Sequence, residues 1–196
     1  MAGAVTERIK ERPVITVRSR ADLRAWLTEN HEQAEGVWLA TYKKAHADHL
    51  SWMEAVEELL CWGWVDAVTQ AVDADRSAHL VAPRKDRSAW SAVNKLLVDQ
   101  ARASGAMTPR GEAAIATAQA NGMWTFLDDV EAGVVPGDLA AALGPHRAVW
   151  DGWPRSVTRG TLEWIKQAKT DATRAKRIAD VAESAARGVR PSPFRR

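Results

Sequence analysis

Alternating hydrophobic and polar positions in the first half of the chain form short runs that are typical of strands. The four runs, rich in β-branched or aromatic residues, are residues 13–17, 37–42, 64–69 and 77–82. Between them, apolar residues recur at helical spacing after Ser19, after Ser51 and from Ser88 or Ala89. The Ser51-Trp-Met-Glu54 sequence also has the spacing of a helix capping box. The front half therefore predicts an α+β arrangement.

From Ser104 onward the pattern is helical throughout. Thr108-Pro109 predicts a helix start and Asn121-Gly122 a helix end, and a last helix is predicted over 170–187. Because no long linker separates the halves, we expect a small N-terminal α/β-sheet subdomain packed against a C-terminal helical subdomain. The predicted boundaries are a flexible N-terminus at 1–12, the α+β subdomain at 13–103, the helical subdomain at 104–188 and a flexible basic tail at 189–196.

Composition and charge favour a globular protein over a nucleic-acid-binding or membrane-spanning one. The 196 residues are 46% hydrophobic, enough for an ordinary core, and the net charge of +2 makes nucleic acid an unlikely main partner. No apolar run approaches the roughly 18 residues that span a bilayer, and Cys61 is the single cysteine. These features predict a cytoplasmic protein without a membrane span. Residues 155–196 hold eleven basic and four acidic residues, which favours a solvated helix face and leaves a partner-binding basic helix as an alternative.

Tryptophan is unusually frequent, with ten in the chain. A group of indoles either fills a core or forms the wall of a binding site. Core filling is the ordinary interpretation. The functional hypothesis places Trp62, Trp64 and Trp90 on one apolar wall of a pocket.

Two carboxylates are candidates for acid–base chemistry. Glu57 lies on the helix after Ser51, and Asp66 lies among Trp62, Trp64 and Val65, where a carboxylate needs a partner or a shifted pKa. A structural ion pair is the ordinary outcome. A catalytic role for Asp66 or Glu57 is the alternative.

Polar groups gather in the segment from Pro83 to Lys95. Arg84, Lys85 and Arg87 precede a predicted helix, and the free backbone N–H groups at the start of a helix attract anions. A carboxylate, phosphate or sulfate could therefore bind there. An N-cap beside a basic surface explains the same residues equally well. The candidate ligand-binding residues in and near this segment are Arg84, Lys85, Trp90, Ser91, Asn94 and Lys95.

Other kinds of chemistry have little support in the sequence. His46 and His49 have no further histidine or cysteine at ligand spacing, so we expect no metal. Cys61 lies between Leu60 and Trp62, an apolar setting that predicts an inert thiol. The phosphate-binding loops of nucleotide-dependent enzymes are missing, and we expect no cofactor.

Several motifs follow one another in order along the chain. They are Tyr42-Lys-Lys, Ser51-x-x-Glu-Ala-Val-Glu-Glu-x-Leu-Cys-x-Gly-Trp-Val-Asp66, Ala82-Pro-Arg-Lys, Ser88-x-Trp-Ser-x-Val-Asn-Lys95, Met107-Thr-Pro-x-Gly111 and Leu162-Glu-Trp-Ile. This ordered series resembles the YdeI/OmpD-associated family, also described as bacteriocin-protection proteins. The resemblance extends from about Val14 to Arg187 and implies a front part similar to small YjbR/CyaY-like α+β domains, a protective role and no defined reaction. Ala67 and Trp62 depart from the family pattern beside the candidate pocket.

Three functions remain open at this stage. The first is a protection or resistance protein that binds a small molecule or peptide in a Trp-lined pocket, with Tyr42 among the ligand contacts. The second is an enzyme that modifies a toxic or secondary metabolite with Asp66 or Glu57. The third is a nucleic-acid or partner-binding module that uses the basic C-terminal helix. The oligomeric state is not predicted.

Overall fold

The computed structural model describes residues 12–195, and the chain divides between Thr125 and Phe126 into two compact units. The predicted flexible start lies, but for its last residue, outside the described residues. The structure confirms the α+β class, with a sheet and helices in the first unit and helices in the second. Helix α5 (Pro109–Ala120) packs on α3 (Trp52–Cys61) and so belongs to the first unit, whereas the sequence pattern placed it in the helical subdomain. The predicted boundaries and the close packing of the two subdomains stay predictions.

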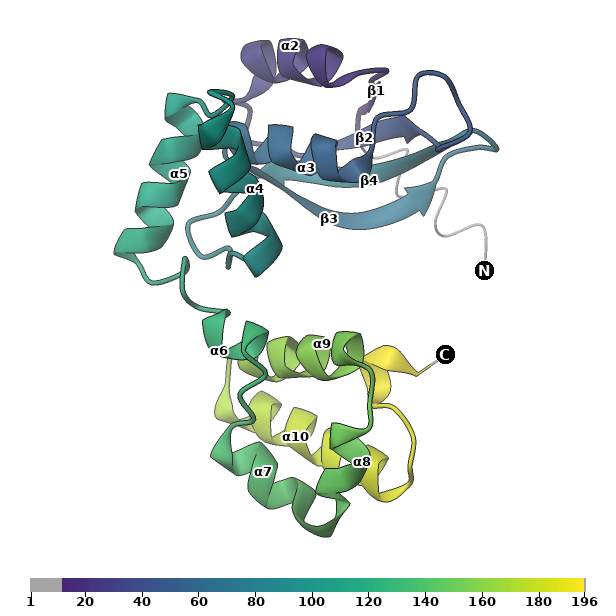
Figure 1. Ribbon diagram of the computed structural model, residues 1–196, viewed down its shortest axis with the longest axis vertical. Helices are drawn as coiled ribbons and strands as arrows, with labels where there is room; N and C mark the ends of the chain where they lie inside the picture. Colours follow the sequence, from purple (N-terminus) through teal and green to yellow (C-terminus); the bar gives the residue numbers. More distant parts are fainter. Residues whose placement is uncertain (1–11, 196) are drawn as a thin grey trace. The chain divides into compact units, whose positions relative to one another are not determined.

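A four-stranded mixed sheet organises the first unit, in the order β1-β2-β4-β3 (Figure 1). Strand β1 pairs in parallel with β2, and the other neighbours are antiparallel. The strands match the four runs of the sequence pattern closely. Their bounds are Val14–Thr16 for β1, Val37–Tyr42 for β2, Trp64–Ala71 for β3 and Arg76–Pro83 for β4.

Helices α2 (Arg20–Asn30) and α3 cover one face of this sheet (Figure 1). Both begin as predicted, with the Ser19 hydroxyl accepting from Asp22 N–H and a complete capping box between Ser51 and Glu54. The core between helices and sheet is apolar and buried; it includes Leu23, Leu27, Leu39, Leu59, Trp64 and Val81.

The loop after β4 is longer than the sequence pattern suggests. Helix α4 (Ala92–Ala103) begins after Ser91, not at Ser88 or Ala89, because Ser91 and Asn94 form a second capping box there. Trp90 therefore lies on the loop and packs into a second core cluster between α3, α4 and α5. Of the apolar residues of α4, Leu97 is buried, but Val93 and Leu96 are about half exposed.

The second unit consists of short helices packed around α10. Helices begin close to Pro136, Pro145 and Pro154 and after Thr170. The buried residues include Leu139, Leu143, Trp150, Ile165 and Val181. The elements are α6 (Asp128–Glu131), α7 (Gly137–Leu143), η1 (Gly144–His146), α8 (Arg147–Asp151), α9 (Arg155–Lys166), α10 (Asp171–Ala186) and η2 (Ser192–Phe194).

None of the helices formed by residues 12–195 is both long enough and apolar enough to cross a bilayer.

Candidate functional site

A fully buried carboxylate, Glu58, joins α2 to α3. Its oxygens accept from Arg20 Nε at 2.9 Å, Arg24 Nη2 at 3.4 Å and Trp62 Nε1 at 3.1 Å. The Arg24 guanidinium also forms an ion pair with Glu58, with Nε 2.9 Å from Oε1. A buried charge needs such partners, because desolvation without them is costly. Sequence reasoning singled out Glu57, which instead lies at the edge of this cluster and accepts from Arg20 Nη2 at 3.0 Å. The signal it missed is the i,i+4 pair of arginines on α2, which matches adjacent glutamates on α3.

An open groove of about 720 Å³ lies beside this buried cluster. The indole of Trp62 forms part of its wall and packs against the ring of His31, with the ring centroids 4.8 Å apart. Arg24 Nη2 donates to Ala106 O at 2.6 Å. Arg24 therefore links α2 to the segment that precedes α5. The lining residues are Arg24, Thr28, His31, Glu32, Trp62, Met107, Thr108, Pro109 and Arg110. Of these, only Trp62 was among the predicted site residues.

The other two predicted wall residues are buried. Trp64 packs edge-on against Trp26 at 5.5 Å in the core under α2, and its Nε1 donates to His31 O. Trp90 is in the cluster between α3, α4 and α5, with its ring 5.1 Å from Trp124. The three indoles therefore do not share one wall, because each packs against a different set of helices.

Asp66 lies in a different polar cluster, on the helix-covered face of the sheet. It accepts from Trp52 Nε1 at 3.3 Å, and the Trp52 ring stacks on His79. Thr69 Oγ1 lies 3.0 Å from His79 Nδ1. A β-bulge between Asp66 and Thr69 makes this possible: opposite residues of paired strands share a face, and the extra residue in β3 returns Thr69 to the face that Asp66 occupies.

The His79 cluster predicts a dependence of stability on pH. Burial lowers the pKa of His79 below its ordinary value, although the charge of Asp66 raises it in part. A lowered folded-state pKa means that the unfolded chain binds more protons, so stability falls as the pH drops through the unfolded value of about 6.5 toward the lower folded value. We expect the melting temperature to fall between about pH 8 and pH 5, and the His79→Gln variant to lose part of that slope. His49→Gln, on an exposed loop residue, is the control. A wild-type slope in His79→Gln would contradict the prediction.

The loop between β4 and α4 is organised by Arg84. Its Nη1 donates to Ala89 O at 2.9 Å, its Nη2 donates to Asn94 Oδ1 at 3.1 Å, and its Cζ lies 3.9 Å from the centre of the Trp90 ring. Burial lowers the pKa of Arg84 to about 10, with Asp66 acting in the opposite direction. Ser91 and Asn94 are engaged in capping α4.

The remaining predicted residues lie apart from these clusters. Lys95 Nζ lies 5.5 Å from the centre of the Trp124 ring. Tyr42, at the end of β2, stacks on His46 at 4.0 Å. His49 Nδ1 lies 2.7 Å from Tyr42 O, and His46 Nδ1 accepts from Asp48 N–H. Lys85 is exposed at the start of the Arg84 loop. Ligand roles for these residues stay predictions.

The single cysteine is held away from solvent. Cys61 is fully buried at the end of α3, and burial, which contributes most, raises the pKa of its thiol to about 11. Because the thiolate is the nucleophile, such a thiol is unreactive near neutral pH.

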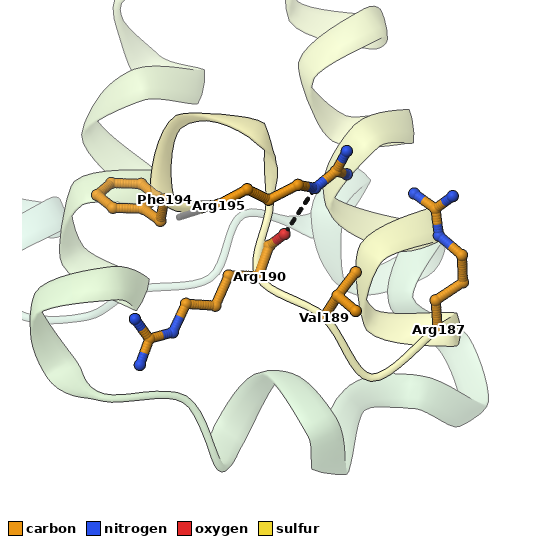
Figure 2. Close-up of a pocket in the computed structure, with 5 residues that line it drawn as sticks. All are labelled: Arg187, Val189, Arg190, Phe194 and Arg195. Atoms are coloured by element: carbon orange, nitrogen blue, oxygen red, sulfur yellow. Dashed lines mark hydrogen bonds between the residues drawn. The ribbon is translucent and has the colours of Figure 1, made fainter.

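The second unit carries a hollow of its own, of about 620 Å³, near the C-terminal end of α10 (Figure 2). It is formed where residues 189–195, expected to be a flexible basic tail, fold back on α10: Ser192 N–H and Arg195 Nη2 donate to Asp180, and Arg195 Nε donates to Arg190 O. The lining residues are Arg187, Val189, Arg190, Phe194 and Arg195. A partner-binding role for the basic C-terminal helix stays a prediction.

Comparison with known families gives two matches. Residues 15–114 match the domain of unknown function DUF8412, and residues 132–188 match the family described as bacteriocin-protection, YdeI or OmpD-associated (OmdA). No curated protein and no solved structure gives a significant match. The family predicted from the sequence is confirmed over 132–188, while the front motifs from Tyr42 to Gly111 lie within the other match. The chain therefore belongs to the DUF8412 family through residues 15–114 and carries a bacteriocin-protection, YdeI or OmpD-associated domain at residues 132–188.

Proposed function

We propose that the protein acts by binding, and that the groove at Trp62 in its first unit receives a small molecule or a peptide end with an aromatic group. The observation that carries this proposal is the fixed position of the Trp62 indole. Glu58 holds Trp62 Nε1 at 3.1 Å, and His31 packs on the ring, so the aromatic surface is fixed before a ligand arrives. A rigid aromatic wall binds with less loss of conformational entropy than a mobile one.

The size and lining of the groove indicate the class of ligand. A volume of about 720 Å³ falls within the range typical of small-molecule sites. Met107, Pro109 and Trp62 supply apolar contact, and Arg110 on the rim has no ion-pair partner among the residues described. An aromatic body with one carboxylate fits this arrangement, because the ring can stack on Trp62 while the carboxylate pairs with Arg110.

Binding fits the contacts of the groove better than covalent chemistry. The nearby Cys61 thiol is protonated at neutral pH, and Glu57 and Glu58 are held by the arginines of α2. The OmdA family is described as bacteriocin-protecting, and sequestration of a toxic compound would protect without turnover. Acid–base catalysis by Asp66 or Glu57 stays the alternative prediction.

The proposal is tested with the indole N–H resonances of ¹⁵N-labelled protein, in which Trp62→Phe identifies the Trp62 signal. Titration with indole-3-acetate and with short peptides ending in phenylalanine should shift the Trp62 signal in a saturable way. Arg110→Ala should weaken binding about tenfold, the effect of losing one charge-assisted contact. Lys169→Ala, an exposed cation of the second unit, is the matched control. A Trp62 signal that stays unchanged with every probe would refute the groove as the site.

A further inference from the structure

A small pocket, which shares Arg110 with the Trp62 groove but has otherwise different lining residues, lies where the Arg84 loop faces α5. Its volume is about 50 Å³, enough for one small chemical group rather than a whole organic ligand. The residues that line it are Arg84, Lys85, Asp86, Trp90, Arg110, Ala114, Thr117 and Ala118. No match to a known family assigns a role to it.

Two buried N–H donors at this pocket have no acceptor. Among residues 12–195, Arg84 Nε and Trp90 Nε1 are two of the four buried side-chain nitrogen or oxygen atoms that make no hydrogen bond. Trp90 is only 1% exposed, so bulk water does not solvate its indole nitrogen. Buried donors are rarely left without an acceptor, because the loss of hydration is then uncompensated. Both residues line this pocket, which makes a group bound in it the candidate acceptor.

The charge at the pocket points to an anion. Arg84 donates only to the neutral acceptors Ala89 O and Asn94 Oδ1, and no carboxylate of the described residues lies within 4.0 Å of its guanidinium. Lys85 and Arg110 also have no ion-pair partner in that part of the chain. The lining thus holds three cationic residues and one carboxylate, Asp86. A largely buried cation without a counter-charge is unfavourable, and an anion in the pocket would relieve this cost.

We propose that this pocket binds a phosphate-type oxyanion, either free or as the terminal group of a small ligand. Its oxygens accept from Arg84 Nε and Trp90 Nε1, while Lys85 and Arg110 pair with its charge. A tetrahedral oxyanion suits the site better than a carboxylate, because it presents acceptors in several directions to donors from the loop and from α5, and because a dianion matches the excess of two positive charges. Apart from the shared Arg110, this proposal does not depend on the Trp62 groove, because its donors Arg84 and Trp90 do not line that groove.

The test follows the indole resonances of the full-length protein during titration with inorganic phosphate at constant ionic strength, with chloride as the reference salt. The Trp90 signal, identified with Trp90→Phe, should shift saturably with phosphate and stay fixed with chloride, while the Trp62 signal does not respond. At a phosphate concentration about 100-fold above Kd, the melting temperature should rise by about 5–10 °C. Tighter binding of phenyl phosphate than of phosphate would identify a ligand-borne group, and equal or weaker binding would identify the free ion.

Two surface variants make the test specific. The Lys85 side chain lines the pocket but is exposed, so the Lys85→Ala variant should fold normally. The variant should bind phosphate about tenfold more weakly. Arg87→Ala removes a cation of the same loop that does not line the pocket, and it should keep the wild-type Kd. Equal loss of affinity in both variants would indicate only general attraction to a basic loop and would overturn the proposal. A Trp90 signal that phosphate does not move would also overturn it, leaving water as the acceptor.

Discussion

Replacing Glu58 with glutamine should lower the free energy of unfolding of the first unit by about 3 kcal/mol, the cost typical of breaking a buried ion pair. Glutamine keeps the size of the side chain but removes the charge that two arginines and the Trp62 indole share. Arg20 and Arg24 are about one third exposed and recover part of their hydration, so the expected loss lies at the lower end of the range for a buried ion pair.

This loss is measured from hydrogen exchange of the α3 amides, which reports opening of the first unit without contribution from the second. The matched control is Glu57→Gln on the same helix. Glu57 has a single arginine partner and is partly exposed, so its replacement should cost about 1 kcal/mol or less. If Glu58→Gln and Glu57→Gln lowered the free energy of unfolding equally, burial of Glu58 would not be the reason that its ion pairs stabilise the first unit. The Trp62 ring should also become more mobile in Glu58→Gln, which would weaken ligand binding in the groove.

Gly111→Ala should destabilise the first unit by about 3 kcal/mol, at the upper end of the usual cost of overpacking. Gly111 lies in the first turn of α5, where a Cβ atom would come 2.3 Å from Cys61 O and 2.8 Å from Cys61 C. Both are backbone atoms, so a rotamer change cannot relieve the clash and α5 must shift away from α3. Such a shift would also disturb the groove, because Thr108, Pro109 and Arg110 lie at the start of α5.

Urea unfolding followed by near-UV circular dichroism measures this effect. Gly137→Ala is the control, because Gly137 is a helical glycine with nothing within 4 Å of its added Cβ. That variant should be neutral or stabilising by up to about 1 kcal/mol, the difference in helix propensity between glycine and alanine. If Gly111→Ala behaved like Gly137→Ala, the close approach of α5 to α3 would be refuted.

Local signals in the sequence account for most of the first unit. Ser19, Ser51 and Thr108 begin helices as predicted, and β-branched runs form the strands, because caps and side-chain periodicity act over a few residues. The start of α4 was placed too early because Ser88 and Ser91 are both good caps. The capping box between Ser91 and Asn94, together with the hydrogen bond from Arg84 to Asn94, favours the second.

The candidate site was only partly predictable, for a physical reason. Trp62 and the basic residues at 84 and 85 were identified, but their neighbours Arg24, His31 and Arg110 come from helices that only tertiary packing brings to them. Which of two adjacent glutamates is buried depends on the angle between α2 and α3, and the bulge in β3 reverses the face on which Thr69 lies. Chain-local patterns thus determined the α+β class, the helix starts and the strands. Tertiary structure alone decided which indoles are sealed in the core, which one borders open space and where buried donors lack an acceptor, because burial and charge pairing depend on residues far apart in the chain.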